Sequence, residues 1–358
     1  SGLDIDLGNS CSRTAFGWAK RTFANRAGKA GEIALDTDGA FSNMMIFGAE
    51  RIGITSDGIG TKIELAERTG IYDTLGYDLV AMVVDDLATA GFEPTTISNI
   101  IDADRLHQPT IDAMMRGLHD AANFAQVSIA GGEIAELGER IGGYGEGMHF
   151  NWASTAVGTL PKELQRPIDG KAVRGGDVVV SLYSPTFRSN GFSKIRRVML
   201  AAFGAQWHEA MYAEGKTYGE ALLAPCVIYS PLVVELIKSG VVLRGVAHIT
   251  GGGVADNFSR VLRPNGLSAD LGGLHAPTPL MQKVQELGGV SDEEAYLYWN
   301  MGNGMLLVVE NEAVAANIIA RAQERGYSAR VAGTIVDDGK RQCRLTTHQG
   351  AALVHGYE

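Results

Sequence analysis

The sequence has little cysteine, little proline and no long apolar run. Its three cysteines, Cys11, Cys226 and Cys343, are widely separated and form neither a CxxC pair nor a zinc-ligand spacing. We therefore expect a reducing, cytoplasmic setting. No apolar stretch approaches the roughly 20 residues that a membrane helix needs, and the N-terminus lacks the pattern of a signal peptide. We expect no membrane segment.

Positive charge is also scarce. The chain has 31 Lys+Arg against 41 Asp+Glu, a formal net charge of −10, which opposes non-specific attraction to nucleic acid and to an anionic membrane surface. We therefore expect neither as a partner. A nucleotide is not excluded, because glycine amides, a lysine and carboxylate-held metal ions can gather in one place.

Aromatic residues make up 7% of the chain and prolines number 10, yet 45% of the 358 residues are hydrophobic. This is a soluble, globular composition, and at this length two domains are the usual solution. The segment 161–177 combines two prolines, several charges and three glycines, which is typical of a surface connection. We predict an N-terminal domain over 1–165 and a C-terminal domain over 166–358.

Apolar periodicity predicts strands that alternate with helices, and so a fold of mixed α and β class. Extended segments are expected at 44–56, 127–130, 177–183 and 241–249. Helices are expected at 77–90, 110–125, 232–238, 254–260 and 312–325. Several of the expected strands run directly into glycine-rich loops, where ligand sites often lie.

The first such loop is SDGIGTK, residues 56–62. It supplies the carboxylate of Asp57, two glycines with an accessible backbone (Gly58 and Gly60), and the side chains of Thr61 and Lys62. This set suits phosphate and metal, although the spacing matches neither the P-loop nor the dinucleotide-binding fingerprint. An ordinary glycine turn that begins a helix explains the spacing equally well.

Acidic residues in apolar surroundings form a second group. Asp85 and Asp86 lie on the expected helix 77–90 beside Met82, Val83 and Leu87, and unpaired acids are rarely buried. Glu133 follows two glycines at the expected end of strand 127–130. Three such carboxylates would suit Mg²⁺, which prefers oxygen ligands. Exposed positions for these acids remain the alternative.

Two further glycine segments lie in the second half. Thr250 precedes Gly251, Gly252 and Gly253, whose amides would form an anion-binding nest if a helix follows. A flexible turn is the alternative. His248, beside this loop, is the only histidine whose setting suggests a role. Ser189 and Asn190 precede another expected helix, where they would contact a substrate or serve as a helix cap.

The order of these motifs resembles one family, the phosphoribosylformylglycinamidine cyclo-ligases, also called aminoimidazole ribonucleotide synthetases. The resemblance covers nearly the whole chain. It rests on LDIDLGN (3–9), SDGIGTK (56–62), GYDLVAMVVDDLATAGFEP (76–94), GGEIAE (131–136), SNGFS (189–193), LLAPCVIY (222–229), AHITGGG (247–253) and WNMGNGM (299–305).

The resemblance implies the two-domain α+β architecture of the PurM-like ATP-dependent synthases. In that architecture an N-terminal mixed sheet completes a barrel across a homodimer, a C-terminal α/β domain lies outside the barrel, and the active site lies between domains. It also implies ring closure of formylglycinamidine ribonucleotide to aminoimidazole ribonucleotide, with ATP converted to ADP and phosphate.

Carried over residue by residue, the resemblance implies roles for the motif residues. Asp57 and Asp86 would hold Mg²⁺ against the ATP phosphates, Lys62 would offset the charge of the transferring phosphoryl group, and Glu133 would add a metal or substrate contact. The nucleotide would be bound by Gly58, Gly60, Thr61, Thr250, Gly251, Gly252 and Gly253. The substrate would be lined by Arg188, Ser189, Asn190 and His248.

This sequence departs from the family pattern at three places. Arg188 stands where the family commonly has histidine, and a guanidinium cannot accept a proton at neutral pH. Asp85 stands where asparagine is frequent, which adds negative charge near the proposed metal. The glycine-rich segment at 39–43 is also altered, which leaves the adenine contacts open.

Two other functions remain open at this stage. The first is another ATP-dependent synthase of the same superfamily that acts on a different acceptor. The second is a non-catalytic nucleotide-binding paralogue, for which Arg188 would be the sign. The joint presence of Asp57, Lys62, Asp86 and Glu133 argues against a decayed site, and ATP consumption separates the two.

Overall fold

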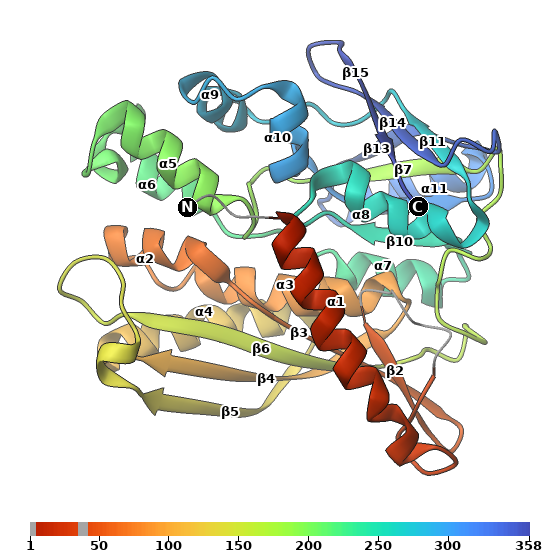
Figure 1. The fold of residues 1–358 in the computed structure, drawn as a ribbon, viewed down its shortest axis with the longest axis horizontal. Coiled ribbons are helices and arrows are strands. Elements are labelled where there is room, and N and C mark those ends of the chain that lie inside the picture. The colour runs from red at the N-terminus through yellow and green to blue at the C-terminus, as the bar shows by residue number, and fades with distance from the viewer. Residues whose placement is uncertain (1–4, 35–41) are drawn as a thin grey trace.

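The computed structural model describes residues 5–34 and 42–358, which form two β-sheets with helices packed between and around them (Figure 1). Of the altered segment 39–43, residues 39–41 lie outside the described ranges. The prediction of two halves of mixed α and β structure is confirmed. No helix within the described ranges is both long enough and apolar enough to cross a membrane.

The first sheet has the strand order β1-β2-β3-β6-β4-β5 and is mixed, because β4 and β5 run parallel while β3, β6 and β4 are antiparallel neighbours. Its strands are β1 (Glu32–Ile33), β2 (Asn43–Phe47), β3 (Glu50–Gly58), β4 (Glu93–Ala103), β5 (Ser128–Glu136) and β6 (Phe150–Thr159). The helices of this half are α1 (Ile5–Arg21), α2 (Ile63–Thr69), α3 (Leu75–Thr89) and α4 (Gln108–Ala125).

The second sheet has the order β10-β12-β7-β13-β11-β14-β15. Its strands are β7 (Val178–Tyr183), β10 (Gly245–His248), β11 (Ser268–Leu271), β12 (Asn303–Val309), β13 (Ala329–Val336), β14 (Gln342–Thr346) and β15 (Ala352–Gly356). Its helices are α5 (Phe192–Phe203), α6 (Tyr218–Leu222), α7 (Ser230–Lys238), α8 (Gly253–Leu262), α9 (Pro279–Leu287), α10 (Asp292–Tyr298) and α11 (Glu312–Glu324). A short hairpin, β8 (Met211–Ala213) with β9 (Lys216–Thr217), lies beside α6.

Helix α3 lies at the centre of the molecule. It packs on β3 and β6 on one side and on α7 and β10 on the other (Figure 1). This position explains why the helix is apolar on nearly every side, since a surface helix carries only one apolar stripe. The few polar residues on α3 are therefore buried between the two halves.

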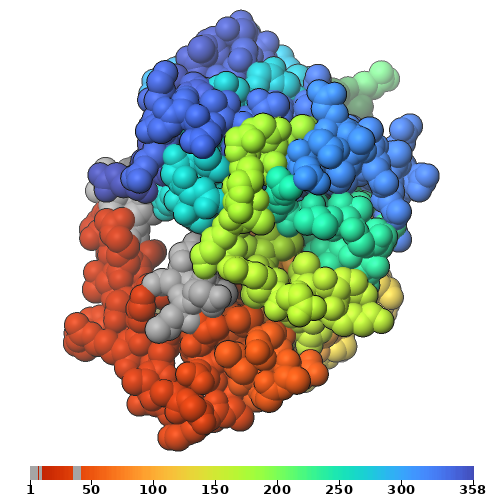
Figure 2. All heavy atoms as spheres, turned by 90° about the vertical axis from the view of Figure 1, so that its right-hand side faces the viewer, coloured from red at the N-terminus to blue at the C-terminus, as the bar shows by residue number. Residues whose placement is uncertain are grey.

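The segment between β6 and β7 runs along the surface from the N-terminal to the C-terminal part of the molecule, as the yellow-green atoms of Figure 2 show. The predicted division at residue 165 falls in this segment and stays a prediction. Each half nevertheless has its own sheet, and the two meet at α3.

Two predicted strands have different limits in the structure. The segment 127–130 was expected to end before its glycines, but β5 continues to Glu136 because β4 pairs with it along its whole length. The strand expected at 241–249 is only β10, Gly245–His248. Residues 241–244 precede it as a connection from α7, because β12 provides a partner only from Gly245 onward.

Candidate functional site

Asp57 lies at the end of β3, where this strand approaches α3. One carboxylate oxygen, Oδ1, accepts a hydrogen bond of 2.7 Å from the backbone N–H of Gly58. A Cβ atom at position 58 would lie 3.2 Å from the carbonyl oxygen of Trp152, a tight contact that favours glycine at this position. Burial raises the pKa of Asp57 to about 6, the Gly58 N–H opposes the rise, and the nearby Asp86 adds to it.

Asp86 faces the same region from α3. Its Oδ1 accepts a hydrogen bond of 2.8 Å from Nδ1 of His248, at the end of β10. Burial raises the pKa of Asp86 to about 7, although the charges of Arg260 and Arg188 act against the rise. The two carboxyls of Asp57 and Asp86 therefore lie close together and resist being ionised at the same time.

This pair fits a divalent cation. A cation beside both carboxylates would offset the cost of burying their charges, which is the main cause of the raised pKa of Asp57, and also the smaller repulsion from Asp86. Among the described residues, no three His, Cys, Asp or Glu side chains gather as a metal-binding group. The pair is thus suited to Mg²⁺, which usually takes one or two carboxylates and completes its shell with water and phosphate oxygens.

Arg188 and His248 lie beside this pair and are almost fully buried, at 1% and 0% exposure. Nη2 of Arg188 is 2.7 Å from Nε2 of His248 and donates 3.1 Å to Oδ2 of Asp85. Burial and the Arg188 charge lower the pKa of His248 to about 3, so the ring is neutral. The predicted charge excess at Asp85 is therefore balanced by Arg188.

Lys62, predicted to face the transferring phosphoryl group, is paired with a carboxylate in the structure. Its Nζ forms a fully buried ion pair of 2.8 Å with Oδ1 of Asp78 and donates 2.7 Å to the carbonyl oxygen of Ala224. Burial raises the pKa of Asp78, and the Lys62 charge acts against that rise. In this arrangement the ammonium fastens the SDGIGTK segment to α3.

The loop before α5 and the loop before α8 approach each other. A Cβ atom at Gly251 would lie 3.7 Å from Nδ2 of Asn190, and Ser189 is buried beside Cys226. The side chain of Asn257 donates to the carbonyl oxygens of Thr250, Gly251 and Gly253. These bonds occupy the carbonyls of the loop. The predicted substrate residues and the predicted anion loop therefore lie side by side.

Glu133 is not brought to Asp57 and Asp86 within one chain. Strand pairing places Gly58, Ala153, Ile100 and Glu133 in one row across β3, β6, β4 and β5. With strands about 4.8 Å apart, the row spans roughly 14 Å. Since successive side chains alternate between faces, Asp57 points to the face opposite that of Glu133. Glu133 is exposed on the edge strand.

The sequence reasoning missed Asp78, Asn257 and the role of the segment 224–230. Asp78 and Asp85 are seven residues apart on α3, and therefore on one face of it. Oδ1 of Asp78 accepts the N–H of Cys226 at 3.0 Å, and Oδ1 of Asp85 accepts the N–H groups of Tyr229 and Ser230 at 2.8 Å. The seven-residue spacing of these acids was the one sequence signal that another segment of backbone would bind along this face of the helix.

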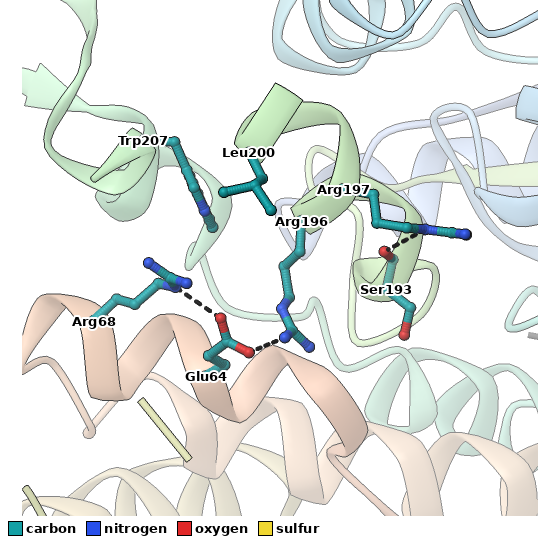
Figure 3. Close-up of a pocket in the computed structure, with 7 residues that line it drawn as sticks. All are labelled: Glu64, Arg68, Ser193, Arg196, Arg197, Leu200 and Trp207. Carbon is teal, nitrogen blue, oxygen red and sulfur yellow. Dashed lines mark hydrogen bonds and ion pairs between the residues drawn. The ribbon is translucent and has the colours of Figure 1, made fainter. Parts of the chain in front are cut away.

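Near this site, a pocket of about 290 Å³ separates α2 from α5 (Figure 3). Glu64 of α2 lies between Arg68 of the same helix, at 2.8 Å, and Arg196 of α5, with which it also pairs. Figure 3 shows both guanidinium groups pointing at this carboxylate, while Arg197 points away from it. The pocket is therefore crossed by an ion-pair bridge between the two halves.

Comparison with known proteins identifies the family of this chain. Residues 37–160 match the model of the AIR synthase related protein N-terminal domain, and residues 174–345 match that of its C-terminal domain. The chain is 35% identical over 341 residues to a phosphoribosylformylglycinamidine cyclo-ligase of Brevibacillus brevis, with 94% of each chain covered. It is 36% identical to the enzyme of that name from Sorangium cellulosum, with 95% of each covered.

Solved structures share the fold at lower identity. The hydrogenase maturation protein HypE in complex with ATP has a TM-score of 0.60 and 15% identity, covering 86% of this chain and 85% of its own. AaThiL complexed with AMPPCP and TMP has a TM-score of 0.58 and 15% identity, covering 88% and 91%. Both likenesses show the two-domain fold.

Proposed function

Because the chain belongs to the phosphoribosylformylglycinamidine cyclo-ligase family, we propose that it closes the imidazole ring of aminoimidazole ribonucleotide from formylglycinamidine ribonucleotide, with ATP as the second substrate. The observation that carries the proposal is the meeting of Asp57 and Asp86 beside the loops 188–190 and 250–253. These are the segments on which the sequence resemblance rests.

The reaction needs activation because an amide oxygen is a poor leaving group. The formyl amide oxygen attacks the γ-phosphorus of ATP, and ADP leaves. The amidine nitrogen then attacks the activated carbon and gives up its proton, and the bond from carbon to oxygen breaks with release of phosphate. Both reacting groups belong to one molecule, so the protein mainly orients them and offsets charge.

Asp57 and Asp86 would hold Mg²⁺, which would neutralise charge on the nucleotide phosphates. Gly60 and Gly251 are exposed, and their backbone amides would donate to phosphate oxygens, while Thr61 adds a hydroxyl. The amide predicted at Gly58 already donates to Asp57. The role predicted for Lys62 toward the transferring phosphoryl group stays a prediction, since the ammonium is paired with Asp78. Glu133 has no part in this proposal for a single chain.

Asn190, beside Gly251, is suited to a polar contact with the ribonucleotide. Its side-chain oxygen is buried and has no hydrogen-bond partner, and such an acceptor gains from a ligand donor. Arg188 is excluded as the group that accepts the proton, because a guanidinium stays protonated.

We also propose that the chain acts as a homodimer through the face of the first sheet opposite α3. Ile100 on β4 is 49% exposed there, and β5 leaves its outer edge unpaired within the described residues. The outward residues of β6 are uncharged: Asn151, Ala153, Thr155, Val157 and Thr159. An exposed sheet face with an uncharged central strand and an open edge favours a second sheet as its partner.

The test of activity uses the purified protein with Mg²⁺, ATP and formylglycinamidine ribonucleotide. Phosphate release is measured beside a diazo-coupling assay for the aminoimidazole product. We expect phosphate and aminoimidazole in equal amounts, each dependent on the ribonucleotide. ATP binding with neither product would overturn the cyclo-ligase function and favour a nucleotide-binding protein without turnover.

A further inference from the structure

Two buried charges from distant parts of the chain meet beside the candidate metal pair. Arg188 follows β7, Asp85 lies on α3, and they are 103 residues apart in sequence. Their side chains are 1% and 0% exposed, and Nη2 of Arg188 is 3.1 Å from Oδ2 of Asp85. A charge at this depth is costly alone and tolerable only when it is paired.

The guanidinium has two further fixed contacts. Nη1 donates 2.8 Å to the carbonyl oxygen of Val227, and Nη2 lies 2.7 Å from Nε2 of His248. Arginine has only donors, so Nε2 of His248 must be the acceptor. The ring proton is therefore on Nδ1, which donates 2.8 Å to Oδ1 of Asp86.

Asp85 is surrounded by donors in the same way. Its Oδ1 accepts the backbone N–H groups of Tyr229 and Ser230, each at 2.8 Å, and its Oδ2 accepts from Arg188. Its Oδ2 also lies 4.0 Å from Nε2 of His248. It thus acts as the counter-charge of the guanidinium and fixes its orientation.

We propose that Arg188 is a positioning residue for the cation site, that it acts through His248 on Asp86, and that Asp85 is its required counter-charge. By donating to Nε2, the guanidinium fixes the His248 tautomer that orients the Asp86 carboxylate toward Asp57. The inference rests on the proposed function, because it takes Asp57 and Asp86 as the Mg²⁺ ligands. Arg188, which the sequence predicted to contact the substrate, would instead orient Asp86, a side chain that binds Mg²⁺.

Removing the charge of Arg188 or of Asp85 alone leaves the other charge buried without its partner, whereas removing both leaves neither. The geometry therefore makes the two positions interdependent. Outer partners of metal ligands set ligand orientation, and their loss costs about tenfold to a hundredfold in metal affinity.

The test is a double-mutant cycle of Arg188→His, Asp85→Asn and the double variant. Mg²⁺ affinity is measured by calorimetry in the presence of AMPPCP, a readout that needs no ring closure. We expect each single variant to weaken Mg²⁺ binding about tenfold or more. The double variant should bind no more weakly than Arg188→His alone, because the charge of Asp85 needs no partner once it is removed together with Arg188. Arg330→His, at an exposed position on β13, is the matched control and should change nothing.

Thermal unfolding of each variant separates positioning from folding. Arg188→Lys keeps a charge beside Asp85, but one ammonium cannot reproduce the planar fork that reaches three acceptors. We expect it to remain folded with Mg²⁺ binding weakened about tenfold and with the KM for the ribonucleotide unchanged. Unchanged Mg²⁺ binding in folded Arg188→His or Arg188→Lys would overturn the positioning role. A double variant as weak as the sum of the two single variants would overturn the pairing.

The inference and the proposed function fail in different ways. Absence of the aminoimidazole product from the parent chain would overturn the cyclo-ligase function alone, because Mg²⁺ and AMPPCP binding still reports on Arg188. Absence of Mg²⁺-dependent AMPPCP binding in the parent chain would overturn both. Product formation together with unaltered Mg²⁺ binding in the folded variants would overturn the inference alone.

Discussion

Several buried charged side chains in this molecule are stable only because a neighbour balances their charge. Each of Asp57 and Asp86 can be ionised in the folded chain when the other is protonated or when a cation lies beside both. Lys62 and Asp78 form a fully buried pair, and Arg188 is paired with Asp85. Removing one partner of such a pair costs about 3–5 kcal/mol, because it leaves a buried charge uncompensated.

The candidate metal pair predicts a definite pH dependence. In the folded chain without cation, the pKa values of Asp57 and Asp86 are about 6 and about 7, above the ordinary value of the unfolded chain. Between the ordinary pKa of 3.8 and these raised values, the folded chain holds more protons than the unfolded chain. The resulting contribution to the free energy of unfolding falls as the pH rises over this range and is lost above about pH 7. Mg²⁺ competes with those protons.

We expect Mg²⁺ to raise the midpoint of thermal unfolding more at about pH 8 than at about pH 6, with an affinity about tenfold higher at the upper pH. Calorimetry and thermal unfolding at both pH values measure this. Asp86→Asn should remove most of the Mg²⁺ effect. The control Asp112→Asn, at a side chain 75% exposed, should retain it. Equal Mg²⁺ affinity at the two pH values would contradict the assignment of the pair.

At the scale of helices, strands and loops, sequence periodicity was a good guide to where three of the helices begin. Helices α3, α4 and α11 begin within two residues of their predicted starts, 77, 110 and 312. The strands β5 and β10 were less well predicted, because their limits depend on where β4 and β12 supply partners. Pairing of this kind involves residues far apart in sequence and leaves no local signal.

The same limit applies to the site. Residue type and spacing predicted Asp57, Asp86, Asn190 and the glycine loop at 250–253 as candidates, because glycines and acids in apolar surroundings are visible in one sequence. The ion pairs of Lys62 and Arg188 were not predictable, since their partners lie 16 and 103 residues away. A charged residue in a motif can either stabilise the fold or bind a ligand, and the residue with which it pairs in the structure shows which role it has.

The loop 250–253 contains glycines with different roles. Gly253 has a φ of +67°, and a Cβ atom there would overlap the carbonyl oxygen of Tyr296 on α10. The backbone of Gly251 lies outside the left-handed region, and a Cβ atom there would lie 3.7 Å from Nδ2 of Asn190, an ordinary contact. Packing therefore requires glycine at 253 but not at 251.

We expect Gly253→Ala to lower the free energy of unfolding by about 3 kcal/mol, because strain and overlap with backbone add together. Gly251→Ala should change it by less than about 1 kcal/mol yet raise the KM for ATP about tenfold, because the added methyl group obstructs the close approach of a phosphate to this backbone. Denaturant unfolding and steady-state kinetics measure the two effects. A Gly251→Ala variant with unchanged KM for ATP would show that no phosphate lies close against the backbone of Gly251.

The whole molecule is built so that one helix, α3, belongs to both halves. Its apolar residues complete the core under the first sheet. Its carboxylates at Asp78 and Asp85 accept hydrogen bonds from the backbone of segment 224–230, which belongs to the second half. The candidate site lies where this helix, the end of β3 and the end of β10 meet. The opposite face of the first sheet has no such cover among the described residues, and this difference favours assembly of two chains.

The proposed dimer predicts the mass of the particle in solution. We expect the chain to elute at twice the 38.1 kDa of one copy in size-exclusion chromatography with light scattering. Ile100→Glu places a charge in the middle of the open sheet face, where burial without a partner is unfavourable, and should give a monomer at micromolar concentration. Val242→Glu, at a position 70% exposed in the other half, should leave the mass unchanged. A parent chain that elutes at 38.1 kDa at all concentrations would contradict the dimer, and an Ile100→Glu variant with the doubled mass would place the contact on another surface.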